Sequence, residues 1–387
     1  MAKNTNQPKK HHYVPCMLLS QFGTGDGRSA KVWVWDKETG RVWNARADSV
    51  AYQNDLYKIP TERLELLDEA DIAKLPPELQ GEYAIEAMFG MMEKSLAYII
   101  KVMQSTLTVP PEGSEALIEL LTAVTLFDMR TPAKMEQARQ MTEALMNLMA
   151  EVNFPDFTDE QRVSVPFKSN RPQLLATVLQ HLPDVMEFML ERHWSLRIAQ
   201  DNNYILTDFP VQHVFARTPL QRWDVPAPAV KNTIAMFPLT RSLLLVGEYE
   251  VSSGVRLADA RWVGFHNANA LGHAERFLFT FEDKFTVLAN ERGLPAYTAI
   301  YNSDERLFTM TPQWFAQEVK AGHIGKPQRM TINGVAPEDY RLDTPMKAAN
   351  GFNPTPQTQV MWKHTFLNEE GEEVPLSELH EKPKDDD

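Results

Sequence analysis

Hydrophobic and polar positions alternate near the beginning of the chain. In residues 31–36 (KVWVWD), Val32 and Val34 fall on one side and Trp33 and Trp35 on the other, which is typical of a strand. Residues 37–40 supply turn-forming side chains before a second short strand at 41–44. We therefore expect a β-hairpin over 31–44, a further strand or extended segment within 50–59, and a linker with short helical pieces at 62–79.

The middle third changes to helical spacing. Within residues 81–105, the apolar side chains recur every three or four positions, as one buried helical face requires; they are Ile85, Met88, Met92, Leu96 and Ile99. Ser114 is placed to cap a second helix that runs to about residue 128. Further helices are predicted over 131–149 and 171–191. Together they predict a central helical bundle.

The pattern changes again at residue 193. Two strands at 193–200 and 203–209, separated by an Asp-Asn-Asn turn, predict a hairpin. We expect further strands at 233–238, 242–247 and 261–265, and helices at 267–280, 283–292 and 312–320. The fold class is therefore predicted as α+β, with an N-terminal β-hairpin, a central helical bundle, and a C-terminal half of mixed antiparallel strands and helices.

These patterns also predict how the chain is divided. We expect a flexible N-terminus (1–10), an α+β domain (11–293) with its helical centre at about 77–192 and its mixed half at about 193–293, a turn-rich extension (294–367) and an acidic tail (368–387). The tail holds nine acidic residues and two lysines, which is typical of a solvated terminus. An acidic arm that covers a basic partner surface is the alternative.

Charge and composition narrow the classes of protein. Thirty-nine basic and 52 acidic residues give a formal net charge of −13, which argues against binding DNA or anionic lipid by bulk positive charge. A single cysteine excludes an intramolecular disulfide framework and fits a reducing compartment. Since no apolar run reaches the roughly 20 residues of a membrane span, and no signal-peptide core is present, we expect a cytoplasmic location.

Two histidines stand at the first element boundary. His11 and His12 precede Tyr13-Val14-Pro15 and an apolar stretch. Neighbours on an extended segment point to opposite sides, so only one imidazole can face a given pocket. The alternative is a solvated start of the chain. Cys16 beside them suggests a Cys/His nucleophile, although a small buried residue fits its apolar followers better.

Carboxylates form a second candidate. Glu82, Glu86 and Glu93 form one stripe along about 16 Å of helix, at the margin of its apolar face. Carboxylates there can bind a divalent metal or act as a base; the alternative is a solvated flank.

Two further positions lie at element ends. Arg130 lies at a helix junction, where it caps carbonyls or holds a carboxylate or phosphate. Asp208 ends a predicted strand before a proline, where an Asx turn and a catalytic acid are both common. Phosphate-binding glycine loops, nucleophile elbows and His-Glu-x-x-His pairs are absent from the sequence.

Taken in order, these stretches resemble the DUF4238 family between about residues 11 and 280. The resemblance rests on H-Y-V-P at 12–15, V-x-V-x-D-K at 32–37, D-x-Y at 55–57, Glu86 and Glu93, R-T-P at 130–132, T-D-F-P at 207–210, P-L-T at 238–240 and the helix beginning near Asn267. Cys16 stands where the family usually has Gln, and Phe209 where Asn is common. The resemblance implies no reaction. It does imply that these polar residues recur as a set, and isolated buried charges need one another.

Two functions follow as hypotheses. In the first, the protein is a metal-dependent hydrolase of a phosphodiester or nucleotide: His12, Glu86, Glu93 and Asp208 supply catalysis and bind Mg²⁺ or Mn²⁺, or Zn²⁺ if the imidazole dominates. His11, Arg130 and Asn267 bind the substrate, and nucleotide or nucleic acid is the expected ligand, with no membrane partner. In the second, the polar cluster is structural and the protein binds a partner without catalysis, in a phage-conflict or mobile-element setting.

Overall fold

The protein is described by a computed structural model, which covers residues 9–60, 74, 76–140, 171–216, 226–290, 293–295, 305–325, 365–367 and 373–375. The chain divides into two compact units. The first comprises Met1–Ala138 and Ser169–Gln328, and the second comprises Arg139–Lys168 and Arg329–Asp387. In the second unit, β14 (Thr365–Leu367) and β15 (Glu373–Pro375) form an antiparallel pair. The predicted acidic tail lies largely outside the described residues, and everything below concerns the first unit.

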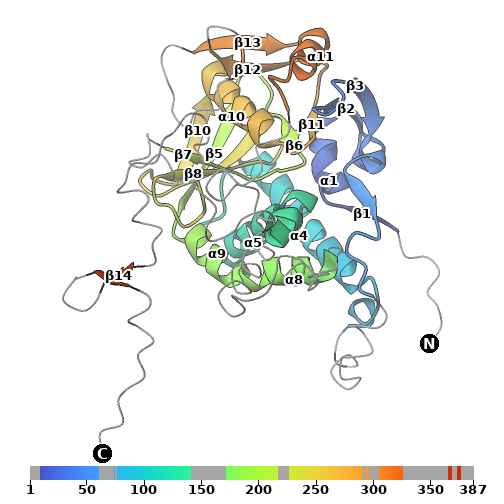
Figure 1. The fold of residues 1–387 in the computed structure, drawn as a ribbon, viewed down its shortest axis with the longest axis vertical. Helices are drawn as coiled ribbons and strands as arrows, with labels where there is room; N and C mark the ends of the chain where they lie inside the picture. The colour runs from blue at the N-terminus through green and yellow to red at the C-terminus, as the bar shows by residue number, and fades with distance from the viewer. Residues whose placement is uncertain are drawn as a thin grey trace, which may run out of the picture. The chain divides into compact units, whose positions relative to one another are not determined.

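The predicted α+β class is confirmed. Helices α4, α5, α8 and α9 gather on one side of the first unit, and the sheets with α10 lie on the other (Figure 1). The helices are α1 (Cys16–Leu19), α4 (Ala84–Thr106), α5 (Glu115–Met129), α8 (Arg171–Gln180), α9 (Leu182–Leu190), α10 (Ala260–His273) and α11 (Pro312–Lys320). Short 3₁₀ turns are η1 (Ser20–Phe22), η2 (Gly27–Ser29), η3 (Ala47–Ser49) and η4 (Pro77–Leu79).

The described strands of this unit form two larger sheets and two pairs. The five-stranded sheet has the order β10-β5-β9-β8-β7, and the four-stranded sheet has the order β3-β2-β11-β6; β1 pairs with β4, and β12 with β13. Their bounds are β1 (Lys10–His12), β2 (Lys31–Asp36), β3 (Val42–Arg46), β4 (Tyr52–Asn54), β5 (His193–Ala199), β6 (Leu206–Thr207), β7 (Gln212–Phe215), β8 (Thr233–Pro238), β9 (Leu243–Glu248), β10 (Gly254–Ala258), β11 (Phe277–Thr280), β12 (Phe285–Ala289) and β13 (Arg306–Met310).

The predicted hairpin and the first two long helices are present. β2 and β3 pair antiparallel, and Val32 and Val34 of β2 are buried, as the alternation predicts. α4 buries the face that carries Phe89, Leu96 and Ile99 against α5. The Ser114 side chain accepts a hydrogen bond from the Leu117 N–H and begins α5. Residues 132–140 are helical as predicted, and the rest of that predicted helix, 141–149, lies outside the described residues.

The predicted hairpin of 193–200 and 203–209 is wrong. β5 pairs antiparallel with β9 and parallel with β10, whereas β6 pairs with β11 in the other sheet. Asn202 and Asn203 instead bond to the β12 region and α10: Thr286 Oγ1 donates to Asn202 Oδ1, and Asn267 Nδ2 donates to the Asn203 carbonyl. Residues 201–203 therefore do separate two strands, but those strands belong to different sheets.

Three predictions between residues 261 and 292 are also wrong. The expected strand at 261–265 is the first part of α10, which Asp259 caps by accepting from the Trp262 N–H. The expected helix at 267–280 ends at His273 and is followed by β11, and the expected helix at 283–292 is β12. α10 is buried around most of its circumference, so it lacks the one-sided spacing by which a surface helix is recognised.

The compact unit continues past the boundary expected at residue 293. β13 pairs with β12, and α11, found where the sequence predicts it, packs against β2 through the buried Trp35. The Trp35 ring meets Phe285 and Phe315 edge-on, with centroids 4.9 and 5.2 Å apart. Its Nε1 donates to Thr280 Oγ1 at 2.8 Å. Residues 305–325 therefore belong to the same core as the N-terminal hairpin.

Candidate functional site

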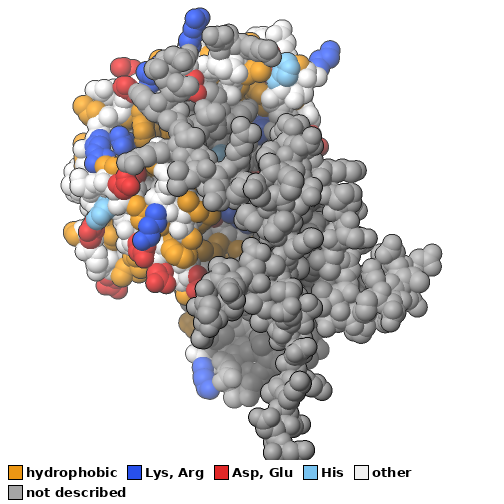
Figure 2. All heavy atoms as spheres, turned by 60° about the vertical axis from the view of Figure 1, so that its left-hand side comes forward, with side chains coloured by type: hydrophobic (Ala, Val, Ile, Leu, Met, Phe, Trp, Pro, Cys, Tyr) orange, Lys and Arg blue, Asp and Glu red, His pale blue; other side chains and the backbone are white. Residues whose placement is uncertain are grey.

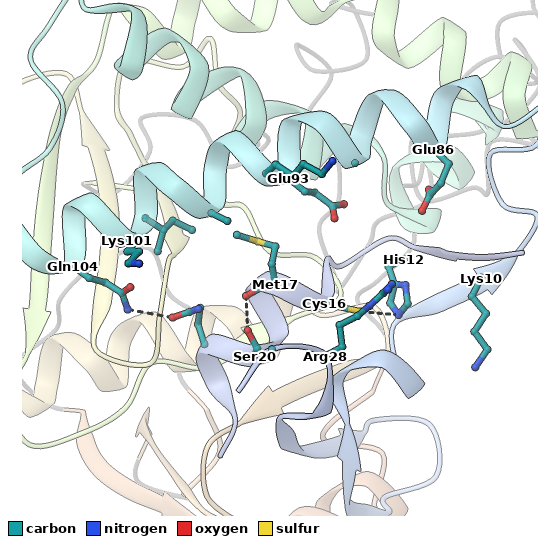
Figure 3. A pocket seen from close by; sticks show the side chains of 16 residues that line it. Lys10, His12, Cys16, Met17, Ser20, Arg28, Glu86, Glu93, Lys101 and Gln104 are labelled. Atoms are coloured by element: carbon teal, nitrogen blue, oxygen red, sulfur yellow. Dashed lines mark hydrogen bonds between the residues drawn. The ribbon is translucent and has the colours of Figure 1, made fainter. Parts of the chain in front are cut away.

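A cavity of about 770 Å³ lies between α4 and the N-terminal segment that runs from β1 to η2 (Figure 3). Its walls from the N-terminal segment are Lys10, His12, Cys16, Met17, Ser20, Gln21, Gly27 and Arg28. Its walls from α4 are Glu86, Gly90, Glu93, Lys94, Ala97, Ile100, Lys101 and Gln104. Three of the residues that the sequence predicts as functional, His12, Glu86 and Glu93, therefore line one cavity.

One face of α4 forms the long wall. Glu86, Gly90, Glu93, Ala97 and Lys101 follow each other at three- and four-residue intervals, so they lie along a single face of the helix. Gly90 is a small residue on this face, and a Cβ placed there would meet nothing within 4 Å. The small side chains thus leave room between the carboxylates and the lysines.

Glu93 is held by Arg130, which lies behind the cavity wall. Nη2 of Arg130 donates to Oε1 of Glu93 at 2.8 Å. The guanidinium is fully buried between the rings of Phe89 and Phe127, whose centroids lie 4.7 and 4.6 Å from Cζ. Arg130 is also the C-cap residue of α5. The ion pair therefore joins the two helices and fixes the position of the Glu93 carboxylate.

Glu86 has a different environment two turns earlier on α4. Its Oε2 is buried and has no hydrogen-bond partner among the described residues. Burial raises the pKa of Glu86 to about 7, against the opposing attraction of Arg130. This carboxyl group therefore exchanges a proton near neutral pH, which suits a general acid or base.

His12 faces the same cavity from β1. Its Nε2 lies 3.2 Å from Cys16 Sγ, and the imidazole also bonds to the backbone of Asp48. Burial, together with the positive charges of Arg28 and Arg130, lowers the pKa of His12 to about 4. The imidazole is neutral at pH 7, so it can accept a proton once a ligand displaces the weakly bonding sulfur.

Cys16 has the opposite shift. Burial raises the pKa of its thiol to about 11, which overcomes the influence of the Arg28 cation. A Cys/His nucleophile needs a thiolate beside an imidazolium. Both shifts favour the neutral pair, so the geometry supports Cys16 as a packing residue on the cavity wall.

Comparison of the sequence with known protein families gives a match. Residues 10–283 match the family described as "Protein of unknown function (DUF4238)". The chain belongs to the DUF4238 family. No curated protein and no solved structure matches it. The matched residues include the whole cavity and all the motifs on which the resemblance rests.

The DUF4238 motif residues separate into two groups in space. His12, Glu86 and Glu93 line the cavity and Arg130 bonds to Glu93 from behind its wall, whereas Asp208 and Asn267 do not line it. Asp208 accepts hydrogen bonds from three successive backbone N–H groups, those of Glu275, Arg276 and Phe277, at 2.8–2.9 Å. Its carboxylate therefore holds the segment between α10 and β11, and its predicted place among the metal and catalytic residues at the cavity is not observed.

Asn267 is likewise engaged on every side. Its Oδ1 accepts from the Ile205 N–H at 3.0 Å, and its Nδ2 donates to the carbonyls of Asn203 and Thr286, both at 2.9 Å. The side chain is fully buried and ties α10 to the segment before β6 and to β12. It is not placed to bind a substrate in the cavity, contrary to its predicted role.

His11 points away from the cavity, as expected for the neighbour of His12 on a strand. Its Nδ1 accepts from the Tyr57 N–H at 2.9 Å, and its ring packs between Tyr57 and Tyr83. Tyr57 in turn donates its hydroxyl to the Arg130 carbonyl. His11 is therefore a buried link between β1 and the helices and does not line the cavity to which the sequence assigned it as a substrate-binding residue.

Sequence reasoning missed the cations of the cavity. Lys10, Arg28, Lys94 and Lys101 line it, and none of them has a carboxylate partner within the described part of the chain. They come from three separate elements and belong to no motif. The one signal in the sequence is the seven-residue spacing of Lys94 and Lys101, which equals that of Glu86 and Glu93 and puts both lysines on one side of the same helix.

A metal centre built from protein ligands alone is not found in the described residues: no three His, Cys, Asp or Glu side chains there are grouped to hold an ion. The described helices also include none that is both long and apolar enough to cross a membrane.

Proposed function

We propose that this protein is a hydrolase of phosphodiester or nucleotide substrates, and that the reaction takes place in the cavity between α4 and the N-terminal segment. The proposal rests on one observation, that a potential acid and a potential base line the same cavity. The Glu86 carboxyl, with a buried unbonded oxygen, and the neutral His12 imidazole line the same cavity, beside four cations without carboxylate partners.

These groups have matching roles in hydrolysis. His12 accepts a proton from the attacking water, whose oxygen forms the new bond to phosphorus. Glu86, protonated in part at neutral pH, gives its proton to the leaving oxygen as the phosphorus–oxygen bond breaks. Lys94 and Arg28 are placed to neutralise the phosphate charge. Glu93, which is bonded to Arg130, acts as a positioning residue.

In this proposal, a divalent cation binds only together with the substrate, whose phosphate completes its coordination shell. Glu93 is the carboxylate left for a cation, since Glu86 carries the proton for the leaving oxygen, and Mg²⁺ or Mn²⁺ is commonly bound by one or two carboxylates with substrate phosphates and water completing the shell. Zn²⁺ in a catalytic site usually takes three protein ligands. The residues present therefore favour Mg²⁺ or Mn²⁺ over Zn²⁺.

The test is turnover by the full chain of bis(4-nitrophenyl) phosphate, dinucleotides and nucleoside triphosphates, each with Mg²⁺, with Mn²⁺ and with a chelator. We expect Glu86→Gln to lower the rate by about 10²–10⁴-fold, the usual contribution of a general acid. Glu187→Gln, which changes an exposed glutamate on α9, is the matched control. Wild-type protein that turns over none of these substrates under any metal condition would rule the proposal out.

The second candidate function, partner binding without catalysis, is supported by the buried half of the cluster. His11, Tyr57, Arg130 and Glu93 form a connected network that fastens β1 to α4 and α5. The two functions differ at Glu86, which takes no part in this network. The phage or mobile-element setting stays a prediction.

A further inference from the structure

A second cavity of about 550 Å³ adjoins the first. It lies between η1, the glycine-containing loop that follows it, and the segment that joins β8 to β9. Its walls include Gly23, Thr24, Gly25, Asp26, Thr240, Arg241, Ser242 and Phe281. Four wall residues are shared by the two cavities: Ser20, Gln21, Gly27 and Gln104. The two spaces therefore meet along a common border.

The border is marked by one exposed hydrogen bond. Nε2 of Gln104, near the end of α4, donates to Oε1 of Gln21 on η1 at 3.2 Å (Figure 3). Both groups are neutral amides, and each can bond equally well to a phosphate or a base. A ligand that passes from one cavity to the other can exchange this bond for bonds of its own.

Positive charge continues across the border. Lys10, Arg28, Lys94 and Lys101 in the first cavity and Arg241 in the second have no ion-pair partner within the described residues. Of the three carboxylates on the walls, Glu93 is paired with Arg130, which leaves Glu86 and Asp26 beside these five cations. In a chain of net charge −13, this is a local excess of cations.

The face turned forward in Figure 2 has a different distribution. Its described basic and acidic side chains are interspersed with each other and with hydrophobic ones. Ion pairs are found elsewhere among the described residues; Glu248, for example, lies 3.4 Å from Arg197 and 3.6 Å from Arg256. The unpaired cations of the two cavities therefore differ from these paired arginines, and they fit a polyanion.

Arg241 adds a flat surface. Its guanidinium lies over the Phe281 ring, with Cζ 3.6 Å from the centroid. A guanidinium fixed in this way presents a planar cation on which a nucleic-acid base can stack. The neighbouring loop exposes its backbone, since Gly25 and Gly27 have positive φ angles and a Cβ at Gly27 would meet nothing within 4 Å. Such backbone is accessible to phosphate oxygens.

The length of the α4 wall also distinguishes a nucleic-acid strand from a mononucleotide. The stretch of α4 from Glu86 to Gln104 spans about 27 Å, which is longer than a mononucleotide and continues into the second cavity. A duplex keeps its bases stacked inside and cannot place one on Arg241, whereas a single strand can enter a recess and stack its bases. The arrangement therefore favours an extended single strand over a mononucleotide or a duplex.

We propose that the two cavities form one groove for single-stranded nucleic acid, with phosphates along Lys94, Lys101 and Arg241 and one phosphodiester at His12 and Glu86. This names the substrate class of the function proposed above and rests on that function for the reacting bond. Binding along the groove requires no turnover, so the two proposals can fail separately.

The test is fluorescence anisotropy with the full chain and labelled oligouridylate and oligothymidylate, each as a dinucleotide and as a strand of about eight nucleotides. We expect the longer strand to bind about tenfold more tightly or better, since it neutralises more cations. Lys101→Gln and Arg241→Gln are each expected to weaken its binding several-fold. Each is also expected to reduce the slope of log affinity against log salt by about 0.7. Both side chains are at least partly exposed, so both variants should fold.

Lys320→Gln is the matched control, because Lys320 is an exposed lysine at the end of α11, outside both cavities. Equal affinity for the dinucleotide and the longer strand would overturn the proposal. So would equal binding of a duplex or of inorganic polyphosphate, because neither can stack a base on Arg241. Tighter binding of either the ribose strand or the deoxyribose strand is compatible with the groove and supports the proposal.

Two further outcomes separate this proposal from the hydrolase. Glu86→Gln protein that has lost turnover should retain the length-dependent binding. If wild-type protein binds the longer strand as described but hydrolyses nothing, the groove stands and the hydrolase fails. If it hydrolyses bis(4-nitrophenyl) phosphate but shows no dependence on strand length, the groove fails and the hydrolase stands.

Discussion

Arg130 and Glu93 form an ion pair in which only one partner is withdrawn from solvent. The Arg130 side chain is 1 % exposed and the Glu93 side chain 26 %, and their bond joins the C-cap of α5 to the middle of α4. Removing the carboxylate would leave a buried guanidinium without its counter-charge. The two carboxylates of the cavity therefore differ: Glu93 is fixed in place by its bond to Arg130, whereas the buried Oε2 of Glu86 has no hydrogen-bond partner among the described residues.

We expect Glu93→Ala to lower the free energy of unfolding by about 3 kcal/mol, the usual cost of breaking a buried pair. Glu93→Gln keeps an acceptor for Arg130 and should cost about 1–2 kcal/mol. Urea denaturation measures both, and Glu187→Ala on the surface of α9 should stay within about 0.5 kcal/mol of wild type. Equal stability of Glu93→Ala and wild type would show that the pair contributes nothing.

Glu86 should make stability depend on pH. Its pKa in the folded chain, about 7, is above the ordinary value of 4.5, so the folded state binds the proton more tightly. The stabilisation from this group is present below pH 4.5 and is lost as pH rises to about 7. Relative to wild type, Glu86→Gln should therefore gain on the order of 1 kcal/mol across that window, allowing for partial exposure. Urea midpoints measured over pH 4–8, with Glu187→Gln as control, check this; a flat difference would contradict it.

His12 should give the opposite slope. Its pKa falls to about 4 in the folded chain from 6.5, so the folded state binds the proton less tightly. Stability from this group is lost as pH falls from 6.5 to about 4. Compared with His12→Gln, wild-type protein should lose on the order of 2 kcal/mol over that range. NMR titration of the His12 ring in the wild type is the direct measurement, and a midpoint near 6.5 would refute the burial argument.

Asp208 is expected to be structural. Asp208→Asn leaves one acceptor oxygen for three backbone N–H donors and should destabilise the protein by about 2 kcal/mol. The same variant, assayed below its unfolding transition, should bind oligonucleotide as wild type does. Loss of binding with unchanged stability would return Asp208 to the functional site.

Cys16 should react slowly. With its pKa raised to about 11 from 9, its thiolate fraction at pH 8 is about 100-fold below that of a free cysteine. Because this is the chain's one cysteine, the rate of alkylation by iodoacetamide reports on it alone. The urea-unfolded chain supplies the reference rate, and similar rates in both states would mean that the thiol is neither buried nor shifted.

The sequence predicted those parts of the fold that depend on local signals. Ser114 begins α5 through its own side chain, and the period of α4 marks its buried face. β5 could not be placed in this way, because its partners, β9 and β10, come about 50 and about 60 residues later, and β10 runs parallel to it. α10 and β12 were misassigned because both are buried, and burial removes the periodicity that distinguishes a helix from a strand.

The candidate site was predictable to the extent that its residues share one helix or one motif. Glu86 and Glu93 lie two turns apart on α4, so their common direction follows from helical geometry. Asp208 and Asn267 share the motif pattern but serve backbone groups that no local pattern reveals. Arg241 is an isolated arginine in the sequence, and only the fold brings it beside Gln21 and Gln104.

The site depends on β1, the strand that pairs with β4 and forms one wall of the cavity. Three residue pairs with β4 and the bond from the Tyr57 N–H to His11 hold this strand, which supplies both the imidazole and one of the lysines. A protein that lacked residues 1–15 would keep the carboxylates of α4, yet its cavity would be open on one side. Such a clipped protein would keep the helical scaffold while losing its proton acceptor, so integrity of the first strand is a simple criterion for a competent preparation.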